Sequence, residues 1–149
     1  MADTEQTREP YAALERELGL LYRRARSASD RLSRAVHPDL DAAAYGLLIR
    51  LRDQGPARPS DLAAFVGVGK ATISRQLRVL EDLKLIERRP DPADGRAHLL
   101  ALTAEGRDRM DAVRSARRRR LHTSLSNWPE EDIATLATLL ARLNALGSD

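Results

Sequence analysis

The sequence predicts a mainly helical fold of the winged-helix type: a helix-turn-helix followed by a two-stranded β wing, with long helices on either side. Two observations predict the centre of this fold. Two short helical segments meet at Gly67, and the spacing of apolar residues changes from helical to strand-like after Leu83. A third observation, heptad spacing over residues 8–36, predicts a long first helix.

The first helix carries small and apolar residues at alternating intervals of three and four. These residues are Tyr11, Leu14, Leu18, Leu21, Ala25, Ala28, Leu32 and Ala35. Because such a seam packs against a second helix of the same kind, we interpret the segment as a dimerisation helix. A long core helix in a monomeric bundle is the alternative that the pattern leaves open.

The helix-turn-helix is expected in the middle of the chain. Helices are predicted over about 41–54, 59–65 and 70–83. Asp39 or Asp41 is suited to cap the first of them, and Pro59 to open the second. The third helix is the predicted recognition helix, and its buried face should hold Ile73, Leu77 and Leu80.

The wing is expected as two strands, Leu85–Arg89 and about 97–102, joined by a loop over 90–96. Asp94-Gly95 between two strand-like segments is the turn signal. Thr103 is suited to cap a long helix that runs to about Leu125, and a last helix should begin near Trp128-Pro129.

Charge is distributed unevenly along the chain. The net charge is only +3, yet residues 50–120 hold 17 basic and 10 acidic side chains, while the two ends together are acidic. A basic middle predicts a surface that faces a polyanion. A chance cluster on a solvated surface is the alternative.

The candidate contacts to DNA lie on the outward face of the recognition helix, at the start of the preceding helix and in the wing. With Ile73, Leu77 and Leu80 buried, Arg75 points outward, where it would read guanine unless it is an ordinary surface arginine. Lys70 and Ser60 suit phosphates, and Arg96 suits a minor groove, with Asp94 either orienting it or forming the turn. The full candidate set is Ser60, Lys70, Ala71, Thr72, Ser74, Arg75, Arg78, Arg88, Arg89, Asp94 and Arg96.

These residues resemble the MarR family of bacterial transcription regulators over nearly the whole chain. The resemblance is carried by the stretch from Ser60 to Arg89, by Asp-Pro-Ala-Asp-Gly-Arg at 91–96, and by Leu-Thr-Ala-Glu-Gly at 102–106. Two positions depart from the family pattern. Gly69 stands where the family often has a capping serine, and Lys84 stands where it usually has glycine.

The resemblance implies a homodimer that binds double-stranded DNA at a pseudo-palindrome and usually represses transcription. It implies one domain over 1–149, with 1–38 and 122–149 as dimerisation helices and 39–121 as the DNA-binding lobe. Many relatives release DNA when a small phenolic or anionic effector binds. His37, Tyr45 or residues early in the long helix after Thr103 are the candidate effector contacts, although these positions could equally be core or solvated surface.

Other classes of protein are excluded or disfavoured by the composition. The chain has no cysteine, which excludes a thiolate metal site and a thiol redox sensor, and its three histidines are dispersed. We find no cofactor motif, no metal site and no convergent catalytic set, so we expect no enzyme. Without a membrane-spanning segment or secretory signal, a cytoplasmic protein is expected. The alternative function is a winged-helix protein-interaction module without specific DNA binding.

Overall fold

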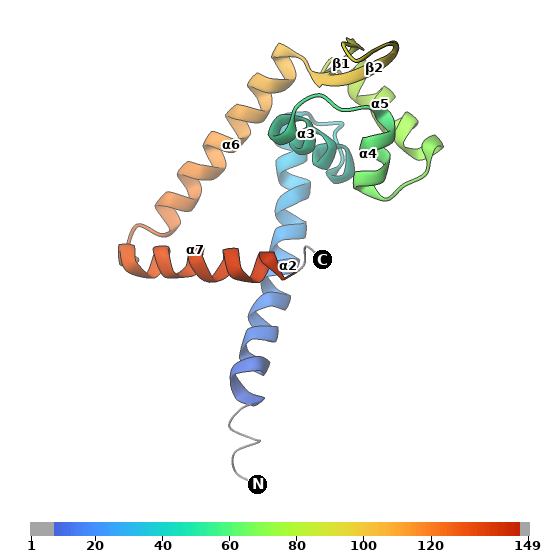
Figure 1. The fold of residues 1–149 in the computed structure, drawn as a ribbon. Helices are drawn as coiled ribbons and strands as arrows, with labels where there is room; N and C mark the ends of the chain where they lie inside the picture. Colours follow the sequence, from blue (N-terminus) through green and yellow to red (C-terminus); the bar gives the residue numbers. More distant parts are fainter. Residues whose placement is uncertain (1–7, 147–149) are drawn as a thin grey trace. The chain divides into compact units, whose positions relative to one another are not determined.

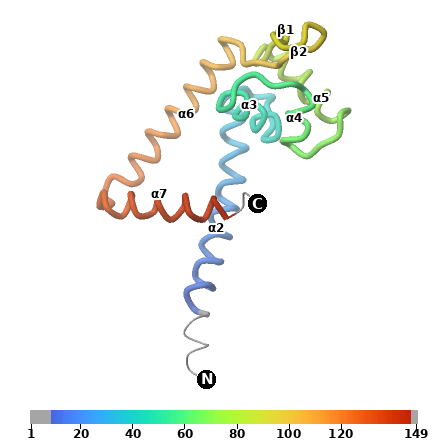
Figure 2. The backbone as a smooth tube through the Cα atoms, in the orientation of Figure 1, coloured from blue at the N-terminus to red at the C-terminus, as the bar shows by residue number. Residues whose placement is uncertain are grey.

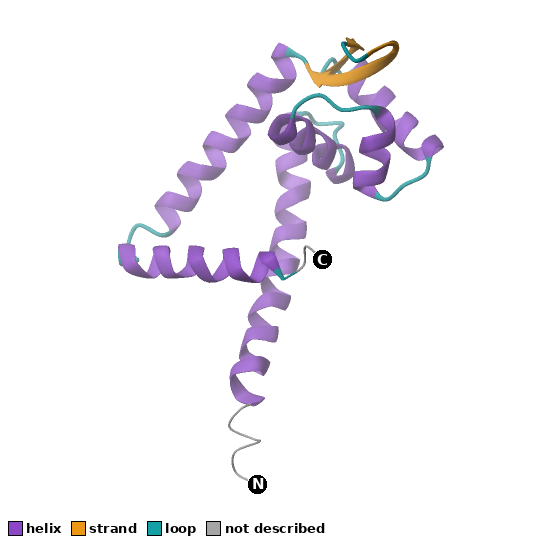
Figure 3. Ribbon diagram, viewed as in Figure 1, coloured by secondary structure: helices purple, strands orange, loops and turns teal. Residues whose placement is uncertain are grey.

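The computed structural model describes residues 8–146 and divides the chain into two compact units, the first ending at Val113 and the second beginning at Arg114. Figure 1 labels the elements, Figure 2 follows the backbone, and Figure 3 colours the helices and the strands of the hairpin differently. The predicted mainly helical winged-helix fold is confirmed. Residues 1–7 and 147–149 of the predicted dimerisation segments lie outside the described residues.

The predicted first helix is present as α2, Arg8–Val36. Its last turns pack on the core of the first unit through Leu32 and Val36. Several of its earlier apolar residues are exposed in the described part of the chain: Tyr11 is 68% exposed, and both Leu14 and Leu21 are 49% exposed. Within the described residues, the heptad seam therefore packs on the core of the first unit at its C-terminal end.

Three further helices build the first unit as predicted. They are α3, Ala42–Gln54, α4, Pro59–Val66, and α5, Lys70–Asp82. Asp41 caps α3, since its Oδ1 accepts the Ala44 N–H at 2.7 Å, and Pro59 occupies the first turn of α4. The core lies between these helices and the hairpin. Its largest fully buried aliphatic side chains are Leu47, Leu48, Leu62, Ile73, Leu77, Leu80, Leu85 and Leu100.

The wing differs from the prediction in the length of its strands. It consists of β1, Ile86–Asp91, paired antiparallel with β2, Asp94–Leu102. Only Pro92 and Ala93 connect the strands, so the predicted loop over 90–96 is wrong. The Asp94-Gly95 signal lies within β2, and Gly95 has no positive φ. Asp91 closes the turn instead, because its Oδ1 accepts the Ala93 N–H at 2.9 Å.

The end of α5 has the hydrogen bonds of a Schellman motif. The Lys84 N–H donates to the Glu81 carbonyl at 2.9 Å, and the Leu85 N–H donates to the Leu80 carbonyl at 3.0 Å. This geometry requires a left-handed residue after the helix, and Lys84 supplies it with φ of +57°. The lysine that departs from the family pattern therefore occupies a backbone conformation that favours glycine.

Replacing Lys84 by glycine is expected to raise the free energy of unfolding by about 0.5–1 kcal/mol. Left-handed backbone costs a residue with a Cβ roughly 1–2 kcal/mol, and the extra freedom of glycine in the unfolded chain offsets part of that gain. Urea unfolding measures the change. Lys84→Ala keeps the Cβ and should show no gain, so an equal gain in both variants would trace the effect to the lysine charge.

Helix α6 spans Ala104–Ser124, and its N-terminal end contacts Lys84 and Leu85, the residues that follow the end of α5. Thr103 caps the helix as predicted, since its Oγ1 accepts the Gly106 N–H at 2.9 Å, and it also donates to the Lys84 carbonyl at 2.6 Å. A Cβ on Gly106 would lie only 2.1 Å from the Leu85 carbonyl oxygen. Glycine at 106 therefore allows the backbone of α6 to meet the backbone that follows α5.

The second unit holds the rest of α6 and α7, Glu130–Ala145. The last helix begins two residues after Trp128, close to its predicted start. None of the residues of α7 is buried, and Leu136, Leu139 and Leu140 are exposed. Among the described residues, no helix is long and apolar enough to cross a membrane.

Candidate nucleic-acid interface

The recognition helix α5 has the two faces that its sequence predicts. Ile73, Leu77 and Leu80 are buried at 1% exposure or less and fix the helix on the core. Arg75 is exposed on the opposite side, as the helical geometry requires. The other candidates on α5 are exposed as well, namely Lys70, Ala71, Ser74 and Arg78, with Thr72 half-buried. The helix thus presents two arginines and several small side chains to solvent.

The beginnings of α4 and α5 add groups suited to phosphate. Ser60 is exposed in the first turn of α4, and Lys70 is exposed at the first residue of α5. The N-cap residue of α5 is Gly69, which offers no side chain to the helix amides. Because the first N–H groups of a helix lack intrahelical acceptors, they are available to an anion here.

The basic candidates differ in whether an acidic side chain already binds them. Within residues 8–146, the side chains of Lys70, Arg75, Arg78 and Arg96 form no ion pair or hydrogen bond. Arg88, by contrast, binds Glu81 through two contacts, Nε–Oε1 at 2.6 Å and Nη2–Oε2 at 3.1 Å. These hydrogen bonds raise the pKa of the Arg88 guanidinium above its usual value. Four cations are thus unpaired, while Arg88 joins the wing to α5.

The remaining wing candidates lie near the hairpin tip or along its strands. Arg89 on β1 pairs with Glu87, with Nη2–Oε1 at 2.6 Å. Arg96 is exposed near the start of β2, and its backbone N–H donates to Asp94 Oδ1 at 3.1 Å. Asp94 therefore orients the backbone of Arg96 and makes no contact with its guanidinium.

A further ion pair, which no sequence pattern predicts, links the wing to the start of α4. Arg58 donates through Nε at 2.9 Å and Nη2 at 2.6 Å to Asp91 Oδ2. Asp91 is 6% exposed, whereas the Arg58 side chain is 43% exposed. No local pattern marks this pair, since its members are 33 residues apart.

The Asp91 carboxylate makes the stability of the fold depend on pH. Its pKa lies below the ordinary value of 3.8, first because it accepts the Ala93 N–H and next because of Arg58. A carboxyl whose pKa falls on folding stabilises the protein at higher pH, and this stabilisation is lost as pH drops below 3.8. We expect the melting temperature of Asp91→Asn to be lower than that of wild type at about pH 7. The difference between the two melting temperatures should shrink as the pH falls towards about 2. A difference in melting temperature that stayed constant over this range would contradict the role of the charge.

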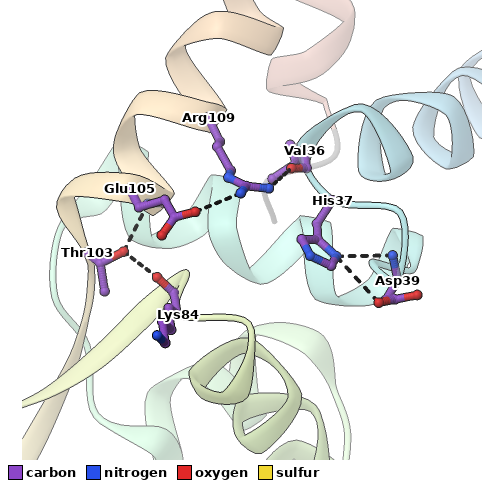
Figure 4. Close-up of polar contacts among 8 residues, drawn as sticks. Val36, His37, Asp39, Lys84, Thr103, Glu105 and Arg109 are labelled. Carbon is purple, nitrogen blue, oxygen red and sulfur yellow. Dashed lines mark hydrogen bonds and ion pairs between the residues drawn. The ribbon is translucent and has the colours of Figure 1, made fainter.

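The two effector candidates occupy different environments. Tyr45 is 6% exposed and belongs to the hydrophobic core. His37 is half-buried after the end of α2, where its Nδ1 accepts the Asp39 N–H at 3.2 Å (Figure 4). Figure 4 also shows Arg109 of α6 donating to the Val36 carbonyl at 3.1 Å and to Glu105 at 2.7 Å. Among the described residues, no group of three or more potential ligands could hold a metal.

Comparison with known proteins identifies the family. The sequence profile of the MarR family matches residues 40–98, which extend from just before α3 into β2. The chain is 33% identical over 139 residues to YxaD, an uncharacterized HTH-type transcriptional regulator of Bacillus subtilis strain 168, covering 93% of this chain and 96% of that protein. The chain belongs to the MarR family.

Further similar proteins extend the comparison. The HTH-type transcriptional repressor NicR of Pseudomonas putida is 32% identical over 106 residues, covering 70% of this chain and 66% of NicR. The crystal structure of RV1404 from Mycobacterium tuberculosis superposes with a TM-score of 0.78 at 25% identity, covering 92% of this chain and 94% of that one. Wild-type apo MarR from E. coli gives 0.62 at 28% identity, covering 85% and 96%.

Family membership decides the broad function. This MarR-family protein is a DNA-binding transcriptional regulator of the helix-turn-helix type. Its relatives are regulators and not enzymes, in agreement with the sequence-based expectation that the chain is no enzyme. The matched residues 40–98 hold α3, α4, α5, β1 and most of β2, the elements that position the candidate interface.

Proposed function

We propose that this MarR-family protein is a homodimeric repressor that binds a pseudo-palindromic operator in double-stranded DNA. The observation that carries the proposal is the outward face of α5, where Lys70, Arg75 and Arg78 are exposed and without acidic partners among the described residues. A helix with this arrangement suits a major groove, and a dimer would present two such helices to two half-sites. The repressor role rests on the family and on the similarity to NicR, a transcriptional repressor.

The basic and small polar candidates have proposed roles in this complex. Arg75 reads guanine, with Ala71, Thr72, Ser74 and Arg78 beside it in the groove. Lys70 and Ser60 hold phosphates, and Arg96 enters the adjacent minor groove. Arg88 and Arg89 contribute positive charge. To contact DNA, each must either keep its ion pair, with Glu81 or Glu87, alongside the DNA contact or break it.

The uncovered apolar residues at both ends of the described chain support the homodimer. Tyr11, Leu14 and Leu21 of α2 are about half exposed or more, and α7 buries none of its residues. Burying apolar surface of this kind is a main driving force of association. We therefore propose residues 1–38 and 122–149 as the dimerisation segments and 39–121 as the DNA-binding lobe.

A small phenolic or anionic effector is proposed to control release of DNA. His37 is the more accessible of the two candidate contacts, at the connection between α2 and α3. The burial of Tyr45 in the core favours a packing role for that side chain. An effector contact at Tyr45 would require the surrounding core residues to move.

Binding to duplexes from the DNA flanking the protein's own gene tests the proposed function. We expect a preference of about a thousandfold or more over scrambled duplex at near-physiological salt, with one dimer per site. Sedimentation of the free protein and of the complex gives the stoichiometry. Equal weak binding to both duplexes, or a monomer on DNA, would contradict the proposal and favour the protein-interaction alternative.

The Arg96→Ala variant tests the wing. Because the Arg96 guanidinium has no partner in the described chain, its loss should weaken binding and lower the salt slope by about one phosphate equivalent per half-site. Titration of affinity against salt measures both quantities. Arg89→Ala removes an arginine already paired with Glu87, so its salt slope should change less than that of Arg96→Ala. Equal slopes for Arg96→Ala and wild type would remove Arg96 from the interface.

A further inference from the structure

The segment before α4 is attached to the wing along its backbone. The Ala57 N–H donates to the Leu100 carbonyl at 3.1 Å, and the Leu100 N–H donates to the Ala57 carbonyl at 2.8 Å. Ala57 thus extends the two-stranded sheet beside β2. The next residue, Arg58, is the N-cap residue of α4. The chain therefore leaves the sheet and enters the helix-turn-helix within two residues.

The Arg58 side chain reaches the tip of the same wing. Its Nε and Nη2 both donate to Asp91 Oδ2, while Asp91 Oδ1 accepts the Ala93 N–H at 2.9 Å. The two oxygens of one nearly buried carboxylate therefore serve different purposes. One closes the wing turn, and the other is bound by the residue that begins α4.

This arrangement matters because an isolated two-stranded hairpin is only marginally stable in water. Backbone pairing with Ala57 occurs at Leu100, towards the far end of β2 from the turn. The Arg58–Asp91 pair is the contact at the tip, and Arg96 lies two residues after the last hairpin pair, Asp91 with Asp94. The direction in which Arg96 projects therefore depends on how the tip is held.

We propose that Arg58 and Asp91 form a positioning pair that holds the wing tip on α4 and so aims Arg96 at the DNA. This inference rests on the proposed function and adds a residue pair to it. The pair acts through Arg96 and need not touch DNA itself. Because it joins the start of α4 to the wing, the phosphate contact at Ser60 and the minor-groove contact at Arg96 keep a fixed spacing.

The half-exposed Arg58 guanidinium could instead bind a phosphate directly, and Asp91→Asn distinguishes the two roles. That variant keeps the Arg58 charge and removes a negative charge from the neighbourhood of DNA. If Arg58 were a direct phosphate contact, Asp91→Asn should bind DNA as tightly as wild type or more tightly. If the pair positions the wing, the same variant should bind more weakly.

The experiment measures dissociation constants for the duplex that wild-type protein selects from a randomised library. The single variants are Arg58→Met, Asp91→Asn, Arg96→Ala and Arg75→Ala. The double variants are Arg58→Met/Arg96→Ala and Arg58→Met/Arg75→Ala. Arg58→Met, Asp91→Asn and Arg96→Ala should each lose the contact of Arg96 with DNA, so each should bind about tenfold more weakly. Arg58→Met/Arg96→Ala should be no weaker than Arg96→Ala, whereas Arg58→Met/Arg75→Ala should show the product of the single effects.

Two controls separate positioning from general damage. Arg58→Lys can keep one contact to Asp91 and should recover part of the lost affinity. Arg52→Met removes an arginine that pairs with Asp53 elsewhere in the first unit and should bind as wild type does. Binding is measured well below the melting temperature of each variant, so loss of folded protein does not contribute.

The outcomes distinguish failure of the inference from failure of the proposed function. If wild type selects no sequence, the proposed function fails. If wild type and Arg75→Ala behave as expected but Arg58→Met or Asp91→Asn binds as tightly as wild type, the inference alone is overturned. Multiplicative losses in Arg58→Met/Arg96→Ala, or no loss in Arg96→Ala itself, would also overturn it.

Discussion

Replacing Gly106 by alanine is expected to lower the free energy of unfolding by about 3 kcal/mol. The added Cβ would lie 2.1 Å from the Leu85 carbonyl oxygen and 2.9 Å from its carbonyl carbon. These are backbone atoms, so no change of rotamer relieves the clash. The first turn of α6 must move, which also strains the hydrogen bonds that Thr103 makes to Gly106 and Lys84. Chemical denaturation of the purified variant measures the loss.

Gly46 provides a matched control for this prediction. It is also a helical glycine, in the middle of α3, and a Cβ built there meets nothing within 4 Å. Gly46→Ala should therefore raise the free energy of unfolding by about 0.5–1 kcal/mol through helix propensity alone. If Gly106→Ala were as stable as Gly46→Ala, the close approach of α6 to Leu85 would not exist in solution.

Arg75→Ala is expected to reduce DNA affinity by about 1–3 kcal/mol and to relax sequence preference at one position in each half-site. Arg75 is exposed opposite the buried face of α5 and forms no ion pair or hydrogen bond within residues 8–146, so its guanidinium is available for guanine. Selection from randomised duplexes, performed with wild type and variant in parallel, measures the change in preference.

Arg75→Lys separates charge from base recognition in the same experiment. Lysine keeps the positive charge but lacks the planar fork that binds two acceptors of guanine. We expect this variant to keep most of the salt-dependent affinity and to lose much of the preference for guanine. If the selected sequence were unchanged in both variants, Arg75 would be a backbone contact only.

The helices could be predicted from the sequence because their signals are local. The apolar spacing of Ile73, Leu77 and Leu80 predicted the buried face of α5, and Thr103 predicted the start of α6. The wing turn could not be predicted in the same way. Asp94-Gly95 is a strong local signal, but the turn forms at Pro92-Ala93, where Asp91 binds both the turn and a residue 33 positions earlier.

The candidate interface, like the fold, could be predicted from the sequence only where local geometry decides it. The outward direction of Arg75 follows from helical geometry alone. The pairing of Arg88 with Glu81 does not, because it depends on how α5 and β1 pack together. Arg89, by contrast, pairs with Glu87 two residues away on its own strand. The packing role of Tyr45 likewise depends on the folded core, because the sequence around it suits core and pocket equally.

The contact between Gly106 and Leu85 also has a mechanical consequence. Two stretches of main chain touch there without an intervening side chain, and Arg109 joins the same part of α6 to the end of α2. A joint of this kind has no rotamer that could absorb a small displacement. A displacement of the first turn of α6 towards Leu85 would therefore have to move the backbone that follows α5 as well.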